Sequence, residues 1–110
     1  MFHVTIYENE KKEYIGFQTI GHAGYAQAGQ DIVCAAASAL IINTVNAIEK
    51  FTDMEASLVS DEEEGFIQYE LKSRPSKESS LLLKTMVLGL SEMAHEEDYA
   101  KYIDLTFEEV

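Results

Sequence analysis

The sequence is poor in several residue types, and each shortage narrows what the protein can be. Its 110 residues include one cysteine, one proline and no tryptophan. A single cysteine cannot form a disulfide within the chain, so no oxidising compartment is indicated. No linker, internal repeat or low-complexity segment separates one part of the chain from another. The length is typical of one domain, predicted here over residues 1–110.

Basic side chains are also scarce. Eight lysines and arginines stand against twenty acidic residues, which gives a formal net charge of −12. Such a surface repels phosphate groups, so direct binding of nucleic acid is not expected. The charge either attracts a cationic partner or simply keeps the protein soluble, and composition alone does not choose between them.

The chain lacks long apolar runs. Its beginning, "MFHVTIYENEKKEY", has no positively charged start followed by an apolar stretch, as a secretory signal would. No run of consecutive apolar residues approaches the ~18 of a membrane span. These features predict a cytoplasmic protein without a membrane partner.

Alternating apolar residues predict five strands. Residues 2–7 and 14–20 flank the polar stretch "ENEKKE" and form a first expected hairpin. The segments 54–60 and 66–72 flank the acidic turn "DEEEG" and form a second one. A fifth strand is expected near the end of the chain, where Ile103, Leu105 and Phe107 alternate with polar residues.

Two helices are predicted between these strands. The first runs from about 32 to 50 after Asp31 as N-cap, with Ala35, Ala36 and Ala39 allowing close approach of a neighbour. Its expected buried stripe consists of Cys34, Ser38, Ile41, Val45 and Ile48. The second helix begins after Ser76 and reaches about His95. Its apolar stripe consists of Leu82, Leu83, Met86, Val87, Leu90, Met93 and Ala94. The order ββαββαβ predicts an α+β fold with two helices packed on a largely antiparallel sheet.

The stretch "GHAGYAQAGQDIVCAAAS", residues 21–38, brings together residues that can do chemistry. Cys34 would lie in the first helical turn, where free amides and the helix dipole favour a thiolate. His22 could accept the thiol proton and return it to a leaving amine, because imidazole titrates near pH ~6.5. First-turn amides could also receive a developing oxyanion. The same residues equally fit a small buried cysteine and a solvated loop histidine.

Two neighbours of this pair are supporting candidates. Asp31 either caps the helix or orients His22, as the third group of a catalytic triad orients the base. Ser38 lies one turn beyond Cys34 and could hydrogen-bond near the sulfur, or bond the carbonyl four residues before it.

The motifs "GHA" and "GQDIVCAAAS", joined by a glycine-bearing loop, resemble the ribosomal-processing cysteine protease family, Prp. The resemblance extends across all 110 residues in the order of elements, although outside residues 21–38 it depends on pattern more than identity. It implies that His22 and Cys34 are the catalytic pair of a cytoplasmic thiol protease active in ribosome biogenesis.

The same resemblance implies a substrate and an assembly. The substrate would be the large-subunit ribosomal protein numbered twenty-seven, made with an N-terminal extension that is removed by a cut after two aromatic residues. The enzyme would be a homodimer. A mobile loop from Gly21 to Gln30, containing Gly24 and Gly29, would lie over the site.

Other functions remain open at this point. The chain could be a non-enzymatic acidic adaptor for a ribosomal protein or an assembly intermediate, or a thiol enzyme such as an acyltransferase or deamidase. No cofactor is expected. No metal site is expected either, because His3, His22 and His95 are scattered and "DEEEG" lacks the EF-hand pattern.

Overall fold

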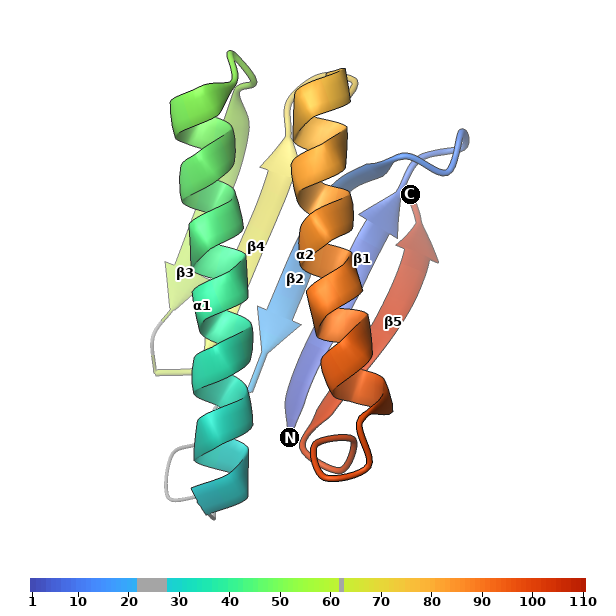
Figure 1. Ribbon diagram of the computed structural model, residues 1–110. Helices are drawn as coiled ribbons and strands as arrows, with labels where there is room; N and C mark the ends of the chain where they lie inside the picture. Colours follow the sequence, from blue (N-terminus) through green and yellow to red (C-terminus); the bar gives the residue numbers. More distant parts are fainter. Residues whose placement is uncertain (22–27, 62) are drawn as a thin grey trace.

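Five strands and two helices account for most of the chain. The computed structural model describes residues 1–21, 28–61 and 63–110. The elements follow the predicted order ββαββαβ, which confirms the α+β class (Figure 1). Their bounds are β1 Phe2–Glu8, β2 Tyr14–Ile20, α1 Ala28–Phe51, β3 Ala56–Asp61, β4 Phe66–Leu71, α2 Lys77–His95 and β5 Ile103–Glu109.

The strands form one sheet in the order β3-β4-β2-β1-β5. Both predicted hairpins are present, since β1 pairs with β2 and β3 with β4 in antiparallel fashion. The hairpins join through antiparallel pairing of β2 with β4. Only β5 runs parallel to its neighbour, β1. The two edges of the sheet are therefore β3 and β5.

Both helices cover the same face of the sheet and lie side by side in opposite directions (Figure 1). The alternation seen in the sequence determines which side chains meet them. Phe2, Val4 and Ile6 of β1 are buried below the helices, while His3 between them is exposed on the other face. The core fills the layer between sheet and helices and includes Phe17, Tyr69, Leu83 and Leu90.

Helix α2 follows its sequence signals closely. Ser76 is the N-cap, and its hydroxyl oxygen accepts a hydrogen bond from the Ser79 amide at 3.1 Å. The helix ends at His95, as predicted. Leu83, Met86, Val87 and Leu90 of the predicted stripe are buried, and Leu82, Met93 and Ala94 are partly buried against them.

Helix α1 departs from prediction in where it begins. It starts at Ala28, so Asp31 is its fourth residue and the expected N-cap at Asp31 is wrong. Asp31 was favoured because aspartate is a common cap and Gly29 precedes it. A single glycine disfavours a helix by only about 1 kcal/mol, so such a local signal is readily overridden.

The buried stripe of α1 is shifted by one position from the predicted one. Its buried residues are Val33, Ala37, Ile41, Thr44 and Ile48. Ile41 and Ile48 were expected, whereas Cys34, Ser38 and Val45 are only half-buried at the margin of this stripe. Ala35, Ala36 and Ala39 are exposed, so no element in the described part of the chain makes the predicted close approach through these alanines.

Helix α1 also has the composition of a membrane span. Residues Ile32–Phe51 have a mean hydropathy of 1.6 over a length that could cross a bilayer. In the structure this segment supplies a wall of the core, and a core helix passes the same test of length and composition. The sequence prediction missed it because polar residues such as Asn43 and Asn46 interrupt the run.

Candidate active site

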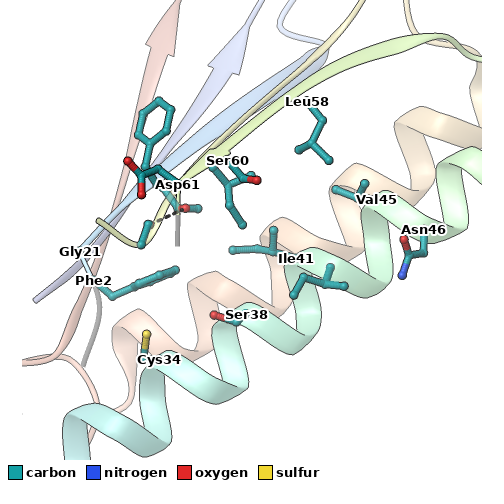
Figure 2. A pocket seen from close by; sticks show the side chains of 15 residues that line it. Phe2, Gly21, Cys34, Ser38, Ile41, Val45, Asn46, Leu58, Ser60 and Asp61 are labelled. Atoms are coloured by element: carbon teal, nitrogen blue, oxygen red, sulfur yellow. Dashed lines mark hydrogen bonds between the residues drawn. The ribbon is translucent and has the colours of Figure 1, made fainter. Parts of the chain in front are cut away.

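A pocket of about 410 Å³ lies between α1 and the end of the sheet formed by β3 and β4. This volume is within the range of small-ligand sites, about 300–1,000 Å³. Figure 2 shows the side chains around it, with Leu58 and Val45 toward one end and Cys34 and Gly21 toward the other. Most of the lining surface is apolar, and the apolar lining residues are Phe2, Ile41, Ile42, Val45, Leu58, Phe66 and Ile67. The polar lining residues are Thr19, Ser38, Asn46, Ser60 and Asp61, together with Cys34.

Among the described residues that line the pocket, Cys34 has the most strongly nucleophilic side chain. It is half-buried, packs against the hydrophobic core on one side and reaches the pocket on the other. The sulfur points away from the helix axis toward the strand residues (Figure 2). A thiol that is supported by packing and still open to a cavity can meet a substrate, unlike a cysteine sealed in the interior.

The position of Cys34 along α1 corrects one expectation. The cysteine lies six residues beyond Ala28, in the second turn of the helix. The free amides of a helix belong to its first turn, and six residues correspond to about 9 Å along the axis. The predicted place of Cys34 in the first helical turn, beside those free amides, is therefore wrong.

Gly21 is held at the mouth of the pocket by backbone contacts. Its N–H donates a hydrogen bond to the carbonyl of Glu64 at 3.1 Å, which ties the end of β2 to the β3–β4 turn. Its φ of +97° favours glycine, and an added Cβ would collide with the carbonyl oxygen of Met1. The residue that precedes His22 in the sequence is thus fixed beside the pocket that Cys34 lines.

His22 itself lies outside the described residues. The other two histidines have partners elsewhere: His3 Nδ1 is 2.7 Å from Asp104 Oδ2. His95 Nδ1 is 2.7 Å from the carbonyl oxygen of Ser91, one turn earlier in its own helix. Neither lines the pocket. Any histidine that serves Cys34 within this chain would therefore be His22.

The structure places the predicted supporting residues, Ser38 and Asp31, at different positions along α1. Ser38 lines the pocket one helical turn from Cys34, and its hydroxyl faces the same cavity (Figure 2). Asp31 lies in the first turn of α1, and its possible contact with His22 is outside the described residues. The expected loop from Gly21 to Gln30 is shorter than predicted, because Gly29 and Gln30 are helical. Gly24 lies outside the described residues.

Sequence reasoning did not find the wall of the pocket that faces α1. Leu58 and Ser60 on β3 and Phe66 and Ile67 at the start of β4 complete the cavity. The alternation of these segments predicted strands but not that their ends lie opposite Cys34. Among residues 1–21, 28–61 and 63–110, no cluster of three or more metal-ligating side chains is present.

Comparisons with known proteins give one consistent result. Residues 1–104 match the family described as cysteine protease Prp. The ribosomal processing cysteine protease Prp of Bacillus subtilis is 30% identical over 110 residues, covering 96% of each chain. The protein of the same name from Staphylococcus aureus is 32% identical over 107 residues, covering 97% of this chain and 99% of its own.

Solved structures agree with the sequence comparisons. The Prp protease of S. aureus, solved in complex with a substrate peptide, superimposes with a TM-score of 0.90 at 30% identity, covering 98% of this chain and 100% of that one. The same protease with a covalently linked product peptide gives a TM-score of 0.86 at 30% identity over the same shares of the two chains. A half-buried thiol facing a pocket and this agreement over nearly the whole length lead to one conclusion: the chain belongs to the cysteine protease Prp family.

Proposed function

We propose that this protein is an endopeptidase that removes the N-terminal extension of the large-subunit ribosomal protein numbered twenty-seven, by a cut after two aromatic residues. The observation that carries the proposal is Cys34 at one end of an otherwise largely apolar pocket. Relatives with matching length are named for ribosomal processing. Apolar walls suit aromatic side chains next to the bond that is cut.

The proposed reaction uses two side chains. His22 takes the proton of the Cys34 thiol, and the sulfur attacks the carbonyl carbon of the scissile bond, forming an S–C bond. The C–N bond then breaks, and the imidazolium gives its proton to the leaving amine. Water, deprotonated by His22, hydrolyses the thioester and restores the free thiol. Ser38, which lines the pocket beside Cys34, is a positioning candidate in this scheme.

A cleavage assay tests the proposal. The protein is incubated with the extended precursor of the ribosomal protein, and the fragments are identified by mass spectrometry. We expect one cut after the aromatic pair by the unaltered protein and none by Cys34→Ala. Turnover by Cys34→Ala at the rate of the unaltered protein would contradict the proposal, provided that both show the same circular dichroism spectrum.

The same assay separates the remaining alternatives. An acidic adaptor would bind the precursor equally with and without the thiol and release no fragment. A thiol enzyme of another class would be alkylated at Cys34 by iodoacetamide but would leave the precursor uncut. A matched His22→Asn variant that folds, binds precursor and does not cut it would assign the base.

We also propose a homodimer in the cytoplasm, where a ribosomal protein precursor is available. The support for a dimer is an exposed apolar stripe on the helical face: Leu81 and Leu88 of α2 are 64% and 61% exposed, two turns apart. Sedimentation velocity of Leu88→Asp tests it, with Val59→Asp on the sheet as control. Only the α2 variant should shift to a monomer.

A further inference from the structure

Among residues 1–21, 28–61 and 63–110, no strand pairs with the outer edge of β3, which lies beside the pocket. In the sheet order β3-β4-β2-β1-β5, β3 has a neighbour on one side only. Natural proteins usually protect such edges, because unpaired N–H and C=O groups readily accept another strand. Here Leu58 and Val59, in the middle of β3, are 54% and 60% exposed. This edge is therefore available to a partner strand.

The register shows which backbone groups face outward. The amide of Lys72 donates to the carbonyl of Glu55 at 2.9 Å, so this opposing pair is a hydrogen-bonded one. In an antiparallel ladder such pairs alternate with pairs that do not bond each other. With Ala56 opposite Leu71 and each later residue one step along, Ser57, Val59 and Asp61 bond to β4. The amides and carbonyls of Ala56, Leu58 and Ser60 consequently face the open edge.

The strand that carries these outward-facing groups borders the pocket. Leu58 and Ser60 also line the pocket with their side chains, and Figure 2 shows Ser60 nearer the Cys34 end than Leu58. A strand added at this edge would have alternate side chains on the helix side of the sheet. Ile42 and Asn46, which are exposed and line the pocket, face that space from α1.

We propose that the peptide substrate binds as an added strand on the outer edge of β3, with its backbone bonded to Leu58 and Ser60 and every second side chain turned toward α1. This proposal rests on the proposed function, because the occupant is the extended segment that is cut. Its support is the continuity of the free edge with the pocket of Cys34. Main-chain bonds hold the peptide extended, and alternate pockets read its side chains.

Hydrogen exchange provides the test. The Cys34→Ala protein is measured with and without a saturating synthetic peptide that spans the extension and the cleavage site. Amides of Leu58 and Ser60 should become at least about 10-fold more protected, while those of Ser57 and Val59, already bonded to β4, should change little. Protection of neither set in the saturated complex would overturn the proposal. Concentration-dependent protection without peptide would assign the edge to a second copy of the chain and would also overturn it.

A pair of variants gives a second readout. Leu58→Ala and Leu58→Pro both lose the side chain, but only proline loses the outward amide, and proline is tolerated where an edge amide faces solvent. Leu58→Pro should therefore lose about 5-fold more kcat/KM than Leu58→Ala, the effect of one hydrogen bond. Equal losses would contradict strand addition. If the unaltered protein cuts the peptide but the saturated Cys34→Ala complex shows no protection, strand addition fails and the proposed function stands. If the unaltered protein does not cut the peptide and the Cys34→Ala protein does not bind it, both fail.

Discussion

At the scale of single residues, the backbone of Gly21 determines how the chain leaves β2 beside the pocket. Three features together hold the Gly21 backbone in one conformation: its positive φ, the hydrogen bond from its N–H to Glu64 and the nearby carbonyl of Met1. Because His22 follows directly in the sequence, any displacement of Gly21 passes to the proposed base. A glycine without a side chain can therefore matter as much to the chemistry as the side chains that line the same pocket.

The first prediction concerns the substitution Gly21→Ala. A Cβ at this position collides with the Met1 carbonyl, and alanine disfavours the positive φ by about 1 kcal/mol. We expect a lower melting temperature and a loss of kcat/KM of at least about 10-fold, since small misplacements of catalytic groups have large effects on rate. Thermal unfolding and precursor cleavage measure the two. Unchanged cleavage would show that this backbone contact does not position the site.

The chemistry-bearing residues of the site were accessible from the sequence, whereas their surroundings were not. Cys34 was selected by its spacing from His22 together with the resemblance to Prp, Ser38 by its place one turn beyond Cys34, and both line the pocket. The environment proposed for the sulfur was wrong, because helix α1 begins before Asp31 and not after it. Local signals for a helix start differ by fractions of a kcal/mol, so a boundary can move by a turn without changing the identity of the helix.

At the scale of elements, the sequence predicted each strand, each helix and both hairpins, but not the order of the strands in the sheet. Residues that alternate along β1 and β5 indicate two strands, yet their parallel pairing joins His3 to Asp104, 101 positions apart. Nothing local encodes that contact. The same limit explains why the wall of the pocket on β3 was missed, since it depends on which hairpin lies under α1.

The second prediction compares two neighbouring side chains on β3. Leu58 lines the pocket, whereas Val59 points to the opposite face, and each is more than half exposed. We expect Leu58→Ala to raise KM about 5-fold, consistent with partial loss of apolar contact to the substrate. Val59→Ala should leave KM unchanged. Both should alter the free energy of unfolding by about 0.5 kcal/mol or less, as surface substitutions do.

Steady-state kinetics with the precursor peptide and urea unfolding check the comparison between Leu58 and Val59. Equal KM values for the two variants would mean that the substrate does not contact the β3 wall of the pocket.

The third prediction concerns the tyrosine at the centre of β4. Tyr69 is 3% exposed, and its ring stacks on Phe17 with centroids 5.4 Å apart. Burial, with a smaller contribution from the charge of Glu49, raises the pKa of Tyr69 above its ordinary value of 10.0. The folded protein therefore keeps this proton to a higher pH than the unfolded chain does, and stability is lost as the pH rises above about 10.

Tyr69→Phe removes that titration while keeping the stacked ring. The free energy of unfolding of the variant should fall less steeply between about pH 10 and pH 11.5 than that of the unaltered protein. Urea unfolding at a series of pH values measures it. Parallel curves for the two proteins would show that Tyr69 does not contribute to alkaline unfolding.

At the scale of the whole molecule, the net charge of −12 bears on how fast the protein meets a cationic substrate. Part of it lies near the pocket, where the lining residue Asp61 accepts a hydrogen bond from the Glu63 amide at 3.0 Å and keeps its carboxylate at the β3–β4 turn. A ribosomal protein is typically basic, so the field of the enzyme would speed its approach. Such steering acts on the association rate and is weakened by salt.

The last prediction is that salt slows the reaction with the basic precursor before it slows the chemistry. Raising the ionic strength from about 20 to 500 mM should lower kcat/KM for the full precursor by about 10-fold and leave kcat unchanged. A short uncharged peptide with the same cleavage site should show little change.

Asp61→Asn keeps the acceptor for the Glu63 amide and removes one charge near the pocket, whereas Glu108→Gln removes one charge from β5 at the opposite edge of the sheet. Only the first should lower kcat/KM at low salt, by about 2-fold. Equal effects of the two variants would mean that the charge acts through its total and not through its position, and the acidic turn would then have no part in guiding the substrate to Cys34.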